Sequence, residues 1–273
     1  NGATRPNGAA CRAEQKSSGG SLWAPVVHRT TSLAAEFPPS FWLPPLLQDT
    51  PPTAPWSLNV PTKTDYSLYL VTDRTWLHTR TLCEVIEEAA TNGVTVVQLR
   101  EKSASSREMY ELGKAVHEVT RAHGIPLIIN DRVDIMLALD AEGVHVGPED
   151  LPVAAARALA GGKIIGTSVN SPDDLAKAHA EGADYIGIGP VFATSTKKDT
   201  RHVLGVNGLK KLVHETHLPC VAIGGINAEN AGAVIQTDVT GVCSISGILA
   251  QPDVGRAVRE FRDLLDQRGE KLA

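Results

Sequence analysis

The chain has 273 residues, with 26 lysines and arginines against 31 aspartates and glutamates and a formal net charge of -5 at pH 7. This balance argues against a surface that coats nucleic acid, so any anionic ligand should be a small molecule at a local basic site. The four cysteines contain no CxxC pair, and no run approaches the roughly 18 apolar residues of a membrane helix. We therefore expect a cytoplasmic protein with small-molecule substrates and no nucleic-acid or membrane partner. Whether it forms a homo-oligomer is left open.

Residues 1–65 differ in composition from the rest of the chain. Ten of the 17 prolines and three of the four tryptophans fall there, in segments such as FPPSFWLPPLLQDTPPTAP that lack helical or strand periodicity. This composition predicts an irregular or disordered extension. A targeting peptide is the alternative, because Arg5, Arg12 and Arg29 lie among Ser, Thr and Ala with few acids. Import into an organelle therefore stays open.

From residue 66 onward, short apolar runs alternate with amphipathic segments. The apolar runs have the length of buried strands and cover residues 67–72, 94–100, 126–130, 143–146, 164–168, 185–189, 220–223 and 241–246. Helical periodicity follows each of them, at residues 81–91, 106–123, 132–139, 152–160, 171–180, 206–217, 228–237 and 252–267. Ser171 followed by Pro172 and two acids is typical of a helix start. The pattern predicts eight strand–helix units.

Parallel strands need crossover connections, and eight strand–helix units in about 200 residues match the lower size limit of a (β/α)8 barrel. An open doubly wound sheet is the competing fold. Against it, no GxGxxG motif follows the first strand, and polar residues follow nearly every strand rather than one switch point. We predict an α/β fold, a (β/α)8 TIM barrel over residues 66–268 with a tail at 269–273, preceded by the irregular N-terminal extension.

In such a barrel the functional residues lie where strands end. The second strand, in VTVVQLREK, ends in Gln98, Arg100 and Lys102 at alternate positions, so the three side chains share one face. Burial of two cations without partners would cost on the order of several kcal/mol per ion unless an anion binds beside them. This strand end therefore predicts an anionic ligand.

Acidic residues follow the next two strands. The third strand ends at Asn130 and Asp131, and the loop after the fourth contains Glu149 and Asp150. Magnesium takes few carboxylates and lets phosphate oxygens and waters complete its shell, so two acids beside two cations indicate a Mg²⁺ site. The alternative is that Asp131 and Asp150 cap the helices that follow them.

The remaining strand ends carry hydroxyls and glycines. The fifth strand ends at Ser168, which is either a ligand-binding hydroxyl or an ordinary turn residue. The loop after the sixth strand contains Thr194, Ser195, Thr196 and Lys197, which could close over a phosphate ester or be a solvated loop.

The seventh and eighth strands end at glycine-containing segments that include Gly224 and Gly225 and then Ser246 and Gly247. Backbone N–H groups in these positions commonly hold a phosphate in barrels, although tight turns also need glycine. His145 lies within the fourth strand, and we interpret it as an interior residue rather than a ligand.

Taken in order, these strand ends resemble the thiamine phosphate synthase family, also called thiamine-phosphate pyrophosphorylases. The resemblance covers about residues 66–268 and is carried by YSLYLVTDR, QLREK, INDR, GVHVGPEDLP, IGTS, IGIGPVFATSTKKD, VAIGGI and SISGI. It implies a transferase that joins a pyrimidine methyl diphosphate to a thiazole ethyl phosphate. The products would be thiamine phosphate and pyrophosphate, and Mg²⁺ would be the cofactor.

The resemblance also implies roles for individual residues. Those implied to bind the pyrimidine diphosphate are Gln98, Arg100, Lys102, Asn130, Ser168 and Lys197, and Arg100, Lys102, Ser168 and Lys197 would act in catalysis. Those implied to bind the thiazole phosphate are Thr194, Ser195, Thr196, Gly225, Ile245 and Ser246. Asp131 and Asp150 would ligate Mg²⁺.

Two other functions are compatible with this fold. A thiazole tautomerase would bind a thiazole phosphate and need an acid or base, but it would have no use for the full set of Arg100, Lys102, Asp131 and Asp150. A noncatalytic barrel that senses thiamine intermediates would bind without turnover.

Overall fold

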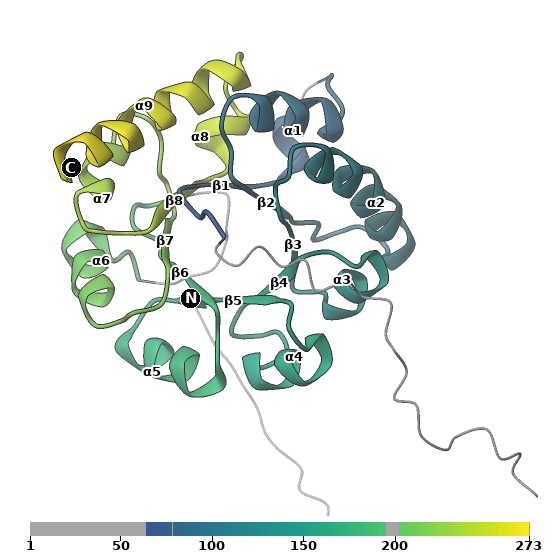
Figure 1. Cartoon of the computed structure of the whole chain (residues 1–273), viewed down its shortest axis with the longest axis horizontal. Helices are drawn as coiled ribbons and strands as arrows, with labels where there is room; N and C mark the ends of the chain where they lie inside the picture. The colour runs from purple at the N-terminus through teal and green to yellow at the C-terminus, as the bar shows by residue number, and fades with distance from the viewer. Residues whose placement is uncertain (1–63, 78, 195–201, 273) are drawn as a thin grey trace, which may run out of the picture. The chain divides into compact units, whose positions relative to one another are not determined.

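The computed structural model describes residues 64–77, 79–194 and 202–272. Within these residues, parallel strands pair in chain order and close into a barrel, which Figure 1 shows as a ring of strands inside a ring of helices. The strands are β1 (Leu68–Val71), β2 (Val96–Leu99), β3 (Leu127–Asn130), β4 (Gly143–Val146), β5 (Ile164–Val169), β6 (Tyr185–Ile188), β7 (Cys220–Ile223) and β8 (Gly241–Ser244). The predicted (β/α)8 barrel is confirmed.

Helices connect successive strands around the outside of the barrel. They are α1 (Leu82–Thr91), α2 (Ser106–Ala122), α3 (Val133–Leu139), α4 (Val153–Ala160), α5 (Pro172–Glu181), α6 (Gly205–His214), α7 (Ala231–Ile235), α8 (Ser246–Leu249) and α9 (Val254–Leu272), with a short 3-10 turn η1 (Arg74–Trp76) after β1. The start of α5 is as predicted, because the Ser171 side chain accepts the Asp174 N–H and Pro172 takes the first helical position.

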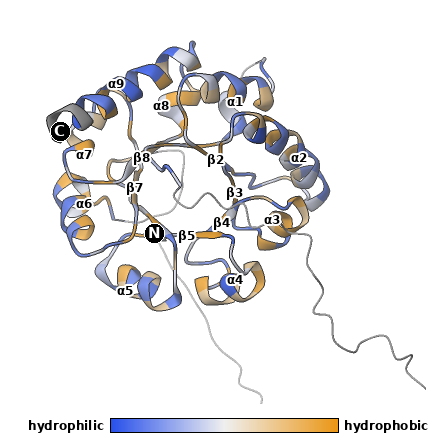
Figure 2. Cartoon of the chain, viewed as in Figure 1, coloured by the Kyte–Doolittle hydropathy of each residue, from blue (hydrophilic) through white to orange (hydrophobic). Residues whose placement is uncertain are grey.

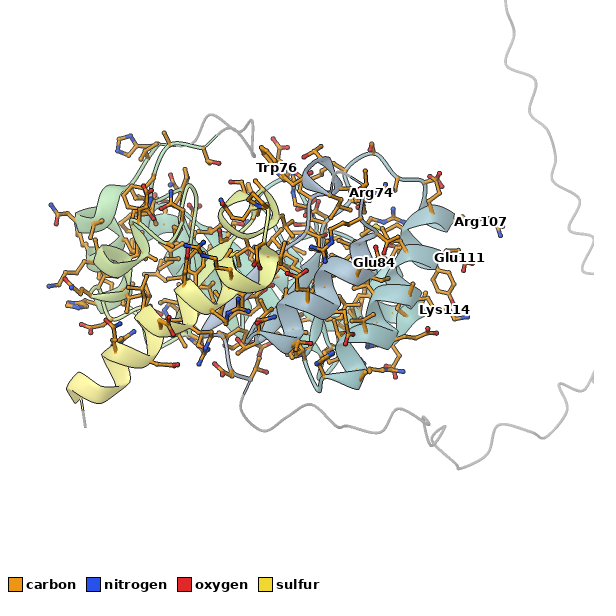
Figure 3. All side chains as sticks on the ribbon, turned by 90° about the horizontal axis from the view of Figure 1, so that it is seen from above. Arg74, Trp76, Glu84, Arg107, Glu111 and Lys114 are labelled. Carbon is orange, nitrogen blue, oxygen red and sulfur yellow. The ribbon has the colours of Figure 1, made fainter. Side chains whose placement is uncertain are left out.

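The hydropathy of the chain follows this layering. In Figure 2 the strands are mostly orange, whereas α2 and α9 carry long blue stretches. Arg107, Glu111 and Lys114 are exposed and point away from the barrel on α2 in Figure 3, at a spacing that places them on one helix face. The apolar residues of the helices pack against the barrel and form one continuous core with the strands.

Several boundaries differ from the predicted ones, among them those of β8, α7 and α9. Strand β8 ends at Ser244, and residues assigned to its end instead begin the extra helix α8. Helix α7 begins late because the Asn227 side chain accepts the N–H groups of Glu229 and Asn230 and forms a turn first.

Helix α9 continues to Leu272, beyond the predicted helix end at residue 267. One glycine inside the helix costs only about 1 kcal/mol, and the residues after it are good helix formers. The predicted extension covers residues 1–65, which lie outside the described residues apart from 64 and 65. Among the helices of the described part, none is long and apolar enough to span a membrane.

Strand register sets the interior of the barrel and so the position of the site. Neighbouring strands place Val71 opposite Gln98 and His145 opposite both Asn130 and Gly166. Gly166 in turn lies opposite Tyr185. Because alternate side chains of a strand share a face, the polar residues at these positions point into one space inside the barrel.

Candidate active site

Two adjoining pockets lie at the carboxyl ends of the strands. The β2 pocket is lined by residues that include Tyr69, Gln98, Arg100, Asn130 and His145. The β8 pocket is lined by residues that include Thr194, Gly225, Ile245 and Ser246. Ser168 belongs to both linings. Two ligands could therefore bind side by side with Ser168 between them.

Arg100 is the main cation of the β2 pocket. Its side chain is only 13 % exposed, and its nearest acid, Asp73, lies 3.8 Å away. The buried Nε atom of Arg100 has no hydrogen-bond partner. The Asp73 carboxylate also accepts hydrogen bonds from the N–H and the hydroxyl of Thr75, so Arg100 shares this carboxylate with Thr75. An arginine that is this buried and weakly paired is suited to an incoming anion.

Gln98 and Lys102 flank Arg100 along the chain. Gln98 is 5 % exposed, and its Nε2 donates to the hydroxyl of Tyr69 at 2.9 Å. Lys102 is 55 % exposed and lies at the rim, where its Nζ is 2.5 Å from Asp131 Oδ2. The β2 strand end therefore combines a buried amide, a buried guanidinium and an exposed ammonium.

Asp131 and Asp150 do not cap the helices that follow them. The N-cap residues of α3 and α4 are Arg132 and Pro152, and neither helix has a side-chain cap hydrogen bond. Asp131 instead adopts a left-handed conformation, with φ 65°, that non-glycine residues rarely take and that directs its side chain to the barrel mouth beside Lys102. The capping alternative is therefore wrong.

The two carboxylates lie close enough to affect each other. Burial raises the pKa of the Asp150 carboxyl, the contact with Asp131 raises it further, and the Gly147 N–H and Lys102 oppose this. The Gly147 N–H donates to Asp150 Oδ2 at 2.7 Å and fixes the side chain. In the described part of the chain, no group of three or more His, Cys, Asp or Glu side chains converges. A pair of carboxylates fits Mg²⁺, which completes its shell with phosphate oxygens and water.

The β8 pocket depends on a close approach of two loops. The N–H groups of Val191 and Phe192 donate to the carbonyls of Ile223 and Gly224, at 2.9 and 3.0 Å. Gly225 has φ 63°, and a Cβ there would lie 2.7 Å from the Ala193 carbonyl oxygen. Glycine is thus required for the β7 exit to lie against the β6 loop.

Thr194 lines the β8 pocket at the start of the β6 loop. Ser195, Thr196 and Lys197 lie outside the described residues, so the structure does not place these predicted site residues. Of the other predicted site residues, those that line one or both pockets are Gln98, Arg100, Asn130, Ser168, Gly225, Ile245 and Ser246. Lys102 borders the groove next to Arg100, Asp150 borders a further pocket that Ser168 also lines, and Asp131 contacts Lys102.

Three side chains that the sequence reasoning did not assign to the site form hydrogen bonds with one another and with Ser168. Tyr69 OH is 2.8 Å from Tyr185 OH, Tyr185 OH is 3.0 Å from His145 Nδ1, and His145 Nε2 is 3.0 Å from Ser168 Oγ. Strand alternation was the signal that could have identified these three residues, since their side chains point into the barrel as that of Gln98 does. Identification of their contacts requires the register across the barrel.

A family model described as thiamine monophosphate synthase matches residues 68–248. The thiamine-phosphate synthase of Caldanaerobacter subterraneus subsp. tengcongensis is 48 % identical over 211 residues, which cover 76 % of this chain and 98 % of that protein. The enzyme of the same name from Desulfitobacterium hafniense is 49 % identical over 201 residues, with 73 % and 97 % covered.

A solved structure agrees with these sequence matches. Thiamine phosphate pyrophosphorylase from Pyrococcus furiosus is similar with a TM-score of 0.70 at 41 % identity, over 75 % of this chain and 97 % of that one. Sequence and structure together show that the chain belongs to the thiamine monophosphate synthase family.

Proposed function

We propose that the protein is a thiamine-phosphate synthase, a transferase that joins a pyrimidine methyl diphosphate to a thiazole ethyl phosphate and releases pyrophosphate. The observation that carries this proposal is the buried, weakly paired Arg100 in the lining of one of two adjoining pockets. Next to it in the chain, Lys102 contacts the pair of carboxylates formed by Asp131 and Asp150. Family membership supports the same reaction. The substrates are therefore two small molecules, each with phosphate.

The β2 pocket would take the pyrimidine diphosphate. The residues assigned to this substrate are Gln98, Arg100, Lys102, Asn130, Ser168 and Lys197. Asn130 is 7 % exposed and lines the pocket, so its amide can contact a heterocyclic ring. Arg100 and Lys102 also border an open groove beside the pocket, where a diphosphate would remain accessible to solvent cations.

The β8 pocket would take the thiazole phosphate. The residues assigned to it are Thr194, Ser195, Thr196, Gly225, Ile245 and Ser246. The apolar side chain of Ile245 suits a thiazole ring, while backbone N–H groups near Gly225 and Ser246 suit its phosphate.

Asp131 and Asp150 would hold Mg²⁺. The raised pKa of Asp150 reflects in part the nearby Asp131, and a divalent cation would relieve this repulsion. When bound, Mg²⁺ would neutralise negative charge on the diphosphate. Within residues 64–77, 79–194 and 202–272, the carboxylates that converge here number two, so the metal would bind best together with the substrate.

The reaction needs charge neutralisation and positioning rather than a protein nucleophile. The bond between the methylene carbon and the diphosphate oxygen breaks, and its electron pair leaves with pyrophosphate. The thiazole nitrogen then contributes its lone pair to the new carbon–nitrogen bond. Arg100 and Lys102 stabilise the departing charge, and the amino group of the pyrimidine delocalises positive charge. Two adjoining pockets hold the reacting atoms near each other, which lowers the entropic part of the barrier.

The test is an assay of the purified chain with both substrates, in which thiamine phosphate and pyrophosphate are measured together. We expect equal amounts of the two products and a requirement for Mg²⁺. Asp131→Asn should slow turnover at least about 100-fold, as loss of an electrostatic stabiliser does. Asp134→Asn is the matched control, because Asp134 is exposed on α3 and paired with Arg132.

Pyrophosphate release that does not require the thiazole substrate would contradict a synthase. Conversion of the thiazole substrate alone, without any pyrimidine diphosphate, would instead support the tautomerase. Binding of both substrates without any product would support the noncatalytic barrel.

A further inference from the structure

A chain of hydrogen bonds crosses the interior of the barrel and joins two side chains of the site. It runs from Gln98 through Tyr69, Tyr185 and His145 to Ser168, with successive atoms 2.8 to 3.0 Å apart. Both ends belong to the residues assigned to the pyrimidine diphosphate. The middle member, Tyr185, is 1 % exposed and has a hydroxyl that contacts both Tyr69 and His145.

Two glycines make room for the rings of this chain. A Cβ at Gly166 would lie 2.1 Å from Cζ of Tyr185, and a Cβ at Gly187 would lie 3.2 Å from Cε1 of His145. Any larger residue at Gly166 would displace the tyrosine ring. The barrel interior is thus shaped around these two rings. A role in filling space alone does not require this shape, since apolar residues at the two glycine positions and in place of the rings would fill the same volume.

The donor–acceptor direction of this hydrogen-bond chain follows from its first member, Gln98. Gln98 Nε2 can only donate, so the oxygen of Tyr69 accepts, and the Tyr69 proton is left for its contact with Tyr185 OH. Burial raises the pKa of both phenols above the ordinary value, so both keep their protons. Tyr185 accepts from Tyr69 and therefore donates its own proton to His145 Nδ1.

The same reasoning reaches the pocket. A neutral imidazole whose Nδ1 accepts a hydrogen bond carries its proton on Nε2. His145 Nε2 then donates to Ser168 Oγ, at 3.0 Å. Because Ser168 Oγ accepts from the histidine, its own hydroxyl proton is free to point into the pockets that Ser168 lines.

We propose that Tyr185 is a positioning residue: its hydroxyl holds His145 in the Nε2-protonated tautomer, so that Ser168 presents its proton to the departing diphosphate. The assignment of the diphosphate to this pocket rests on the proposed function. Without the Tyr185 hydroxyl, His145 can carry its proton on Nδ1 and accept the Ser168 proton at Nε2. Ser168 would then present only lone pairs to an anion, which repels them.

The kinetic test compares Tyr185→Phe with Ser168→Ala and with the double variant. Tyr185→Phe should lower kcat about 10-fold to 100-fold, the range typical of one lost hydrogen-bond donor at a developing charge, with the KM for the pyrimidine diphosphate within about 3-fold. The double variant should be no slower than Ser168→Ala by more than about 2-fold, because both changes remove one donor. Tyr66→Phe is the control, since the rings of Tyr66 and Tyr185 stack with centroids 4.8 Å apart, but Tyr66 is not a member of the hydrogen-bond chain.

Multiplied losses in the double variant, or a kcat for Tyr185→Phe equal to that of Tyr66→Phe, would overturn the proposal. A purely structural role predicts the first of these results.

A second measurement reads the tautomer itself and needs no activity. Nitrogen chemical shifts of 15N-histidine-labelled protein separate protonated from unprotonated ring nitrogens, and the His145 signals are assigned by their absence in His145→Asn. We expect an unprotonated Nδ1 in the wild type and a mixture of both tautomers in Tyr185→Phe. A wild-type proton on Nδ1 overturns the proposal even if the variant does not fold. A wild type with the expected tautomer but no synthase activity would instead count against the proposed function.

Discussion

Substitution of Arg100 separates the demands of folding from those of catalysis. Arg100→Met keeps the length of the side chain and removes the charge. At about 4 Å and an effective dielectric constant of about 20, the attraction between the Arg100 guanidinium and one charge of the diphosphate is worth about 4 kcal/mol. In the free protein, the nearby Asp73 carboxylate already offsets part of the Arg100 charge. A net loss near 2.7 kcal/mol in the transition state corresponds to about 100-fold in rate. We therefore expect kcat/KM to fall at least about 100-fold.

The same substitution should not destabilise the fold. Arg100 Nε is buried without a partner, and such an unsatisfied donor costs about 1–3 kcal/mol. Asp73 keeps its hydrogen bonds from Thr75 after the change. The Tm of Arg100→Met should therefore equal or exceed that of the wild type.

The assay measures pyrophosphate release at saturating thiazole phosphate, together with thermal unfolding. Arg74→Met is the control, because Arg74 is 50 % exposed and pairs with Glu101 through two hydrogen bonds of 2.8 Å. Arg74, labelled in Figure 3, borders the same open groove as Arg100. Activity of Arg100→Met within about 3-fold of the control would refute this reasoning, as would a lowered Tm that accounts for the loss.

Three further predictions follow from particular side chains. Because burial and Asp131 raise the pKa of Asp150, its ionised form destabilises the fold, and Asp150→Asn should raise the Tm of Mg²⁺-free protein at pH 7. The gain should shrink as the pH falls through the folded pKa and vanish below the ordinary pKa of an unfolded aspartate. Burial raises the pKa of Glu142, but the hydrogen bonds from His117 and a backbone N–H outweigh it and lower the pKa. Glu142→Gln should therefore cost about 1–3 kcal/mol in unfolding experiments near pH 7, progressively less as the pH falls through the folded pKa, with kcat unchanged. Gly225→Ala should raise the KM for thiazole phosphate in steady-state assays, because its Cβ would meet the main chain of the β6 loop; an unchanged KM would argue against the assigned pocket.

The fold could be predicted because strand and helix periodicities alternate without interruption from residue 66. In a parallel barrel every strand ends at the same face, so Gln98, Asn130 and Ser168 could be placed together without knowledge of register. The boundaries of α8 and α9 could not, since hydrogen bonds and weak propensities decide where a helix begins or ends.

Other features of the site depend on three-dimensional geometry. The choice between a helix cap and a mouth carboxylate for Asp131 depends on its φ of 65°. The contact between Tyr69 and Tyr185 joins strands β1 and β6, which are not neighbours in the barrel. No periodicity within one strand predicts such a contact, because it depends on ring size and on the space that Gly166 leaves across the interior.

The most direct test of the account is a crystal structure with thiamine phosphate, pyrophosphate and Mn²⁺ in place of Mg²⁺. The account predicts an anomalous manganese signal in contact with both Asp131 and Asp150, with pyrophosphate beside Arg100 and the thiazole phosphate beside Gly225. Manganese bound elsewhere, or pyrophosphate located away from Arg100, would contradict it.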